Sequence, residues 1–267
     1  MNWTLFKASL QLRRTSLIWY AIGLTAYGWM MVAFFPLIET NIDYQAMIEQ
    51  VFTEEMMAAF GGVGVEFSTL GGFMAIEYLT LIWVFIVGAA VITFVAGALG
   101  GAVEDGTMEV TLSQPVSRTT VALTSYLGMA TYAVILNFVT VATIYLPGLL
   151  HDVDVPLDSM ALLFVVGSLV TLAIGGFAFL VSAASSGKGR TIAITLGVMV
   201  AMYLADVLGN LTDKAEWLID FSLFNYSEPN RIIDNLDVPA STWLVFGIAA
   251  AVTFAAGMYV FQKRDVV

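Results

Sequence analysis

One polar segment, residues 103–118, interrupts a largely apolar chain and holds the side chains best placed to do chemistry. Its acids are Glu104, Asp105 and Glu109, and its base is Arg118. The segment contains no catalytic constellation of nucleophile, base and orienting group. We therefore interpret its carboxylates as groups that cap helices or contact a partner protein.

A short helix is expected inside this polar segment. Met108 and Leu112 are four residues apart, which places both on one helical face, and Val110 is a candidate third member of that apolar stripe. Glu104, Asp105 and Glu109 would then lie on the rest of the surface. Such a helix is predicted to contact the membrane bundle along its apolar stripe.

The ends of this short helix carry recognisable signals. Asp105 or Thr107 is the candidate N-cap, because short polar side chains accept bonds from free helical N–H groups. Pro115 is expected to end the helix, since proline lacks an N–H and disfavours a helical residue before it. Ser117 is the candidate N-cap of the long apolar helix that comes next. The two helices thus meet at a sharp corner.

Two other polar segments are weaker candidates. His151, with Asp152 and Asp154, has the residue types to bind a divalent cation weakly, although we favour a solvated acidic turn. Residues 185–190, SSGKGR, superficially resemble a phosphate-binding loop. However, serine stands where that pattern needs its first glycine, and glycine stands where it needs serine or threonine. The chain is therefore expected to carry no ATP-hydrolysing motor, and no metal site or cofactor of its own.

The whole chain must position these groups inside a membrane. Its 267 residues are 59% hydrophobic and 12% charged, whereas soluble domains are about 25% charged. Each transmembrane helix needs about 20 mainly apolar residues. We predict an all-α polytopic membrane protein with six transmembrane helices, at Leu17–Phe35, Ile76–Gly100, Val121–Leu149, Met160–Ala184, Thr191–Leu208 and Trp243–Phe261.

The basic residues predict the orientation of these spans. Most of the ten lie on the side shared by both termini, namely Lys7, Arg13, Arg14, Arg118, Lys188, Arg190, Lys263 and Arg264. The positive-inside rule makes that side cytoplasmic in a multi-pass plasma-membrane protein. Most acids lie on the other side. That asymmetry has three open readings: adaptation to high salt, attraction of cationic solutes, or a solvated surface of no special role.

We treat residues 1–267 as a single transmembrane domain. Residues 1–14 are expected to form an interfacial helix, and residues 103–118 a cytoplasmic loop. Two extracytoplasmic segments, 36–75 and 209–242, are longer than turns. The first is expected to contain an amphipathic helix over Tyr44–Phe60, and the second a short interfacial or re-entrant helix; packing on top of the bundle is favoured over a binding role for both.

The predicted spans are almost free of ionisable side chains. Proton- or ion-driven carriers normally keep such residues inside their spans, so this class is disfavoured. Glu77 and Asp206 are expected near the outer ends of their helices. Asn137 is the main deep polar group. An interhelical hydrogen bond is favoured for it over contact with a transported substrate.

The segment from Glu104 to Arg118, EDGTMEVTLSQPVSR, resembles the signature of ABC-2-type permeases, in which an acidic residue and Gly–Thr open the loop and Pro–x–Ser–Arg closes it. The ending Tyr259–Asp265, YVFQKRD, resembles the family's aromatic, basic and acidic terminus. The predicted topology is similar to the small six-span branch of that family.

The resemblance implies a permease subunit of an ATP-driven exporter. Such a subunit dimerises with a second copy or a paralogue, within membrane lipid, and binds cytoplasmic ABC ATPase subunits that hold ATP and Mg. No nucleic-acid partner is expected. The coupling residues would be Glu104, Asp105, Gly106, Thr107, Met108, Glu109, Leu112, Pro115 and Arg118. An amphiphile, either lipid-like, peptide or drug-like, is the expected substrate, and the alternative is an ATPase-coupled scaffold that moves no solute.

Overall fold

The computed structural model describes residues 2–39 and 68–264 and shows helices with no strand in those ranges. Six helical spans are long and apolar enough to cross a membrane: Arg14–Glu39, Leu70–Glu104, Arg118–Leu150, Leu157–Ala184, Lys188–Leu211 and Ala240–Lys263. Each contains one predicted span and extends it by at most six residues at either end. The all-α polytopic prediction is therefore confirmed. The expected helix Tyr44–Phe60 lies outside the described residues.

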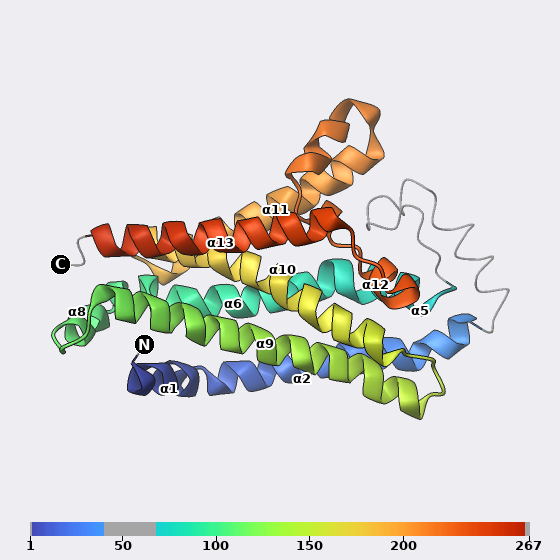
Figure 1. Cartoon of the computed structure of the whole chain (residues 1–267), viewed down its shortest axis with the longest axis horizontal. Coiled ribbons are helices and arrows are strands. Elements are labelled where there is room, and N and C mark those ends of the chain that lie inside the picture. The colour runs from blue at the N-terminus through green and yellow to red at the C-terminus, as the bar shows by residue number, and fades with distance from the viewer. Residues whose placement is uncertain (1, 40–67, 265–267) are drawn as a thin grey trace.

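The spans form one elongated bundle, with the N- and C-terminal ends together at the end that carries α8, Thr107–Leu112 (Figure 1). α2, Arg14–Glu39, packs along α9, Arg118–Leu150. α10, Leu157–Ala184, packs against α9, against α6, Val84–Ala98, and against α13, Ala240–Lys263. α11, Lys188–Leu211, leans away from the bundle toward its far end.

The second span is the most enclosed. In its most apolar stretch 67% of the residues are buried, whereas the figure for α11 and α13 is 22%. It is broken into α5, Leu70–Met74, a π-helical segment η1, Ala75–Trp83, then α6, Val84–Ala98, and α7, Gly100–Glu104. A π-helix is rare and is found frequently at functional sites. Neighbouring helices fix this one: the Trp83 indole N–H donates to the Thr140 hydroxyl at 2.8 Å.

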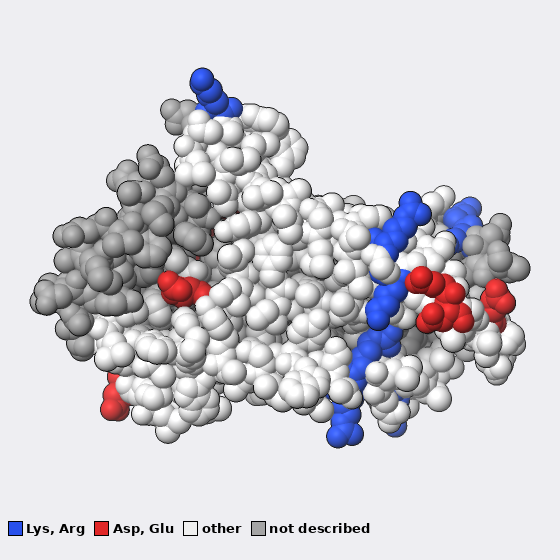
Figure 2. Space-filling model, turned by 180° about the vertical axis from the view of Figure 1, so that it is seen from behind, with Lys and Arg blue, Asp and Glu red and all other residues white. Residues whose placement is uncertain are grey.

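Charge marks the two ends of the bundle. Figure 2 shows Lys and Arg gathered in a band across one end, with acids beyond them and a broad uncharged middle. The band lies at the end that carries the termini and α8. By the positive-inside rule this end faces the cytoplasm, and the uncharged middle is the part that lipid surrounds.

Short helices cover both ends of the bundle. α1, Trp3–Leu12, lies at the cytoplasmic end, where the Asn2 side chain caps it by accepting from two backbone N–H groups. Its position at the membrane interface remains a prediction. At the outer end the chain forms η2, Asp213–Phe221, η3, Phe224–Tyr226, and α12, Pro229–Asn235.

The helices of the spans continue into the predicted outer segments 36–75 and 209–242. α2 runs on to Glu39, α5 begins at Leu70, and α11 reaches Leu211. α12 anchors the start of the second span, since the Asp234 carboxylate accepts from the Gly71 N–H and the Thr69 hydroxyl, both at 2.8 Å. The segment after α11 is divided: Trp217 in η2 is exposed, whereas Phe224 in η3 is buried.

Candidate functional site

The cytoplasmic corner between the second and third spans consists of α7, α8 and the start of α9. The break between α7 and α8 falls at Gly106, whose φ of +70° lies in the left-handed region. Residues with a Cβ rarely adopt this conformation, so glycine fits this turn. Gly106 is also the residue that precedes α8, and no side chain caps the helix there. The prediction that Asp105 or Thr107 caps it is wrong; the Thr107 hydroxyl donates instead to the Ala102 carbonyl.

α8 is anchored on one face only. Met108 is 2% exposed, and Leu112 packs against the same core. Val110 is 66% exposed, so its placement in the apolar stripe is wrong: it lies two residues from Met108, which turns it to the far side of the helix. Glu109 is exposed as well. The outward face of α8 thus offers an apolar and an acidic side chain to the cytoplasm.

The helix ends before its predicted stop. α8 finishes at Leu112, and Ser113 rather than Pro115 is its C-cap. Pro115 lies exposed in the link to α9. The prediction for Ser117 is confirmed, because its hydroxyl accepts from the Thr120 N–H at 3.1 Å as the N-cap of α9.

Glu104 bonds this corner to the fifth span. Its carboxylate accepts from the Lys188 backbone N–H at 2.8 Å, at the first residue of α11. A negative charge there is favourable, because the N-terminus of a helix carries unpaired N–H groups and the positive end of the helix dipole. Gly100 of α7 adds a second contact, since its N–H donates to the Ser182 hydroxyl of α10 at 3.0 Å.

Arg118 bonds the other end of the corner to the C-terminal span. Its guanidinium donates to the Arg264 carbonyl. Arg264 in turn donates to the carbonyls of Ala183 and Ser185, at 3.0 and 2.7 Å, and to the Ser186 hydroxyl. A cation at the C-terminal end of α10 is favourable with respect to the helix dipole. Partial burial lowers the pKa of Arg264 from its usual value, yet an arginine stays charged at neutral pH.

A third arginine closes the same end of the bundle. The Arg13 Nε donates to the Phe94 carbonyl at 3.1 Å, and its guanidinium lies over the Phe94 ring, 4.6 Å from the centroid. Burial lowers the pKa of this group too. Arg13 lines a cavity of about 360 Å³ that also borders Asp105 and Lys188. The polar corner, α1 and α11 therefore meet around one cavity at the cytoplasmic surface.

The structure thus gathers the predicted residues into one region with three different roles. Glu104 and Arg118 are internal links, Met108 and Leu112 are anchors, and Asp105, Thr107, Glu109 and Pro115 are exposed. Sequence reasoning missed the two helix ends that Glu104 and Arg264 cap. A carboxylate or guanidinium next to an apolar span is the signal that could have found them, but the partner helix cannot be read from spacing along one chain.

Asn137 lies far from this corner, inside the bundle. It is 2% exposed, and its amide donates to the Thr171 hydroxyl of α10 at 3.0 Å and to the Ala133 carbonyl of its own helix at 2.9 Å. The favoured interhelical hydrogen bond is therefore present. A role in a transport pathway stays a prediction.

The His151 turn shows no metal-binding geometry within the described residues. His151 ends α9 and is exposed, as is Asp152. In the described ranges, no group of three or more His, Cys, Asp or Glu side chains is placed to hold a metal ion.

The helical bundle, its uncharged middle and its positively charged end define a multi-pass protein of the plasma membrane. Comparison with known families is more specific. Residues 6–262 match the family described as "Multidrug efflux system permease Rv1217c, C-terminal domain", and the chain belongs to that family of transport permeases. The comparison with curated proteins gave no match.

Proposed function

We propose that this chain is an ABC-2-type permease subunit of an ATP-driven exporter. Separate cytoplasmic ABC ATPase subunits, which bind ATP and Mg, would dock on the outward face of α8. A second copy of the chain or a paralogue would complete the transporter in the membrane. The family to which the chain belongs supports export, since its description names multidrug efflux.

The observation that carries this proposal is the construction of the α7–α8 corner. α8 exposes Glu109 and Val110 to the cytoplasm, while Glu104 holds the first residue of α11 and Arg118 holds the end of α13. A force applied to α8 is therefore transmitted through these bonds to α11 and α13. It also acts on the second and third spans, between which α8 lies. A passive connector needs none of these long-range bonds.

An amphiphilic substrate fits the interior of the bundle. The described polar groups inside it, such as Asn137, Thr140 and Thr171, already have hydrogen-bond partners. Asn137 donates to Thr171, Thr140 accepts from Trp83, and both threonines donate to carbonyls of their own helices. Few of them remain to bind a sugar or a hydrated ion. A lipid-like or drug-like molecule would need few polar partners.

Reconstitution tests the proposal. The chain is expected to copurify with an ABC ATPase and, in sealed vesicles, to move a fluorescent amphiphile only when ATP and Mg are supplied on the ATPase side. Copurification with an ATPase but no movement of any amphiphile would favour the scaffold alternative. Transport that needs an ion gradient and no ATPase would contradict both.

A further inference from the structure

Asp206 is a buried carboxylate in the outer half of the molecule. It lies in α11, where it is only 5% exposed. Ser222 lies beside the carboxylate, but Oδ1 has no hydrogen-bond partner among the described residues. A buried carboxylate oxygen without a partner costs free energy, so its presence here calls for a ligand or a function.

A polar cavity of about 200 Å³ lies against Asp206, and we call it the outer cavity. Its walls come from the π-helical segment η1, the outer end of α11, η3 and the start of α12. Its polar lining includes Thr80, Asp206, Asn210, Asn225, Ser227 and Glu228. Amides and hydroxyls supply hydrogen bonds there without adding charge.

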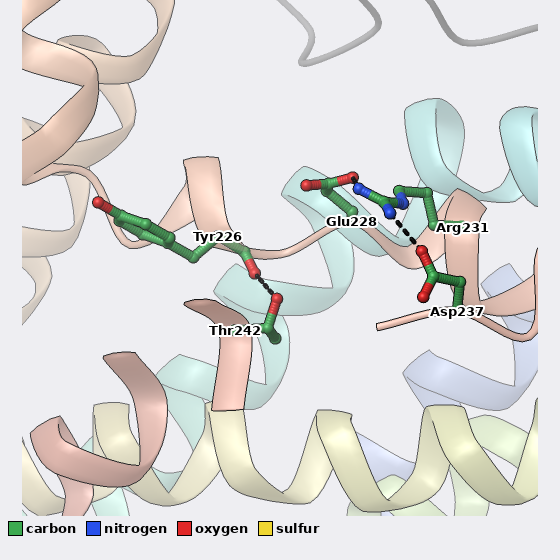
Figure 3. Close-up of polar contacts among 5 residues, drawn as sticks. All are labelled: Tyr226, Glu228, Arg231, Asp237 and Thr242. Atoms are coloured by element: carbon green, nitrogen blue, oxygen red, sulfur yellow. Dashed lines mark hydrogen bonds and ion pairs between the residues drawn. The ribbon is translucent and has the colours of Figure 1, made fainter. Parts of the chain in front are cut away.

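The basic side chain of α12, Arg231, is already paired with acids. Arg231 forms ion pairs with Glu228, at 3.0 Å, and with Asp237 (Figure 3). The negative charge of Glu228 is therefore neutralised by Arg231. Asp206, in contrast, forms no ion pair in the part of the chain that the structure describes. Thr242 holds η3 in place beside the outer cavity, because its hydroxyl donates to the Tyr226 carbonyl at 2.9 Å. The outer cavity thus has a negative charge that no described basic side chain balances.

One aromatic side chain, Phe224, lines the outer cavity, and two further rings pack against it. The Phe224 ring lies 5.4 Å from that of Tyr203 and 6.1 Å from that of Phe85. Tyr203 precedes Asp206 by three residues on α11, so the two side chains share a helical face. Aromatic faces attract cations, most strongly where water is excluded.

An apolar pocket adjoins the same aromatic side chain. It shares Phe224 and Ser227 with the outer cavity and continues along Met199, Met202 and Phe246. The buried carboxylate, the aromatic rings and the apolar pocket lie next to one another in space. Together they match one ligand chemistry, a positive group attached to an apolar body.

We propose that the outer cavity binds the cationic group of an amphiphilic organic cation, with Asp206 as its counter-ion and the Tyr203–Phe224 ring pair beside it. As a transport site this rests on the proposed function, whereas the binding itself does not. The proposal gives the excess of acids on the outer side a role, because a negative outer surface concentrates cations near this cavity.

Equilibrium binding to the purified full-length chain in lipid nanodiscs tests the site. The probe is radiolabelled tetraphenylphosphonium, and its control is tetraphenylborate, which has the same shape and the opposite charge. Asp206→Asn is expected to weaken tetraphenylphosphonium binding about tenfold or more, which corresponds to about 1.4 kcal/mol. Asp220→Asn, an exposed carboxylate of η2 outside the cavity, is expected to leave binding unchanged.

A variant that is expected to gain affinity serves as a control for misfolding. Asn225 is an exposed residue that lines the cavity, so Asn225→Asp adds a second negative charge and is expected to tighten tetraphenylphosphonium binding severalfold. A misfolded protein would not show this gain. The assay contains neither ATP nor ATPase, so a failure of coupling leaves its result unchanged. Unaltered affinity in Asp206→Asn, equal binding of tetraphenylborate, or no binding by the unmodified chain would overturn the site.

Discussion

Replacing Gly106 with proline is expected to abolish ATP-driven transport while the six spans stay folded. Proline fixes φ near −65°, whereas Gly106 has a φ of +70°, so the turn between α7 and α8 cannot form. α8 would then leave its seat around Met108. No heavy atom lies within 4 Å of a Cβ built at Gly106, so the effect comes from the backbone alone.

Two milder substitutions provide the controls for this position. Asparagine adopts the left-handed conformation more readily than other residues with a Cβ, so Gly106→Asn is expected to keep most of the transport. Gly106→Ala costs about 1–2 kcal/mol in that conformation and is expected to give an intermediate rate. Transport is measured in vesicles with the partner ATPase, and folding by size-exclusion elution and thermal unfolding. Equal transport by the proline and asparagine variants would contradict the role of the turn.

Replacing Glu104 with lysine is expected to uncouple ATP hydrolysis from transport. The substitution puts a positive charge at the N-terminus of α11, where the carboxylate now accepts from the Lys188 N–H. The reversed interaction with the helix dipole and the lost hydrogen bond together destabilise this contact by about 1–2 kcal/mol. The ATPase should still bind, because Glu104 faces α11 and the outward face of α8 is unchanged.

Glu109→Lys is the matched control for Glu104→Lys. Both replace an exposed glutamate of the same corner, but Glu109 lies on the outward face of α8. It is expected to weaken ATPase binding, which copurification measures, whereas Glu104→Lys is expected to lower the amount of substrate moved per ATP hydrolysed. If both variants lost ATPase binding alone, Glu104 would be a docking residue and the proposed internal link would have no part in coupling.

The sequence predicts the spans well because the membrane leaves few alternatives. Backbone groups in lipid must bond within their own helix, so long apolar stretches such as Leu157–Ala184 become helices wherever they occur. The Ser117 cap was predictable for a similar reason, since the hydroxyl and its N–H partner are close along the chain.

The contacts between distant segments could not be predicted in the same way. Glu104 and Lys188 are 84 residues apart, and Arg118 and Arg264 are 146 apart, so one sequence contains no sign of either bond. The prediction of a side-chain cap for α8 failed for a local reason. Gly106, in the left-handed conformation, stands at the N-cap position of α8 and has no side chain to accept a hydrogen bond. Asp206 was placed near the outer end of its helix, but the cavity beside it depends on η1 and η3, which fold back from other parts of the chain.

The proposed coupling depends above all on contact between the outward face of α8 and the ATPase. The chain contains no cysteine, so a single thiol can be placed without first removing others. Val110→Cys, at a side chain 66% exposed on α8, is expected to cross-link efficiently to the copurified ATPase through a short thiol–amine reagent, and Asp220→Cys at the outer end is expected not to do so. A Val110→Cys chain that copurifies with the ATPase and transports normally, yet forms no cross-link, would contradict this contact.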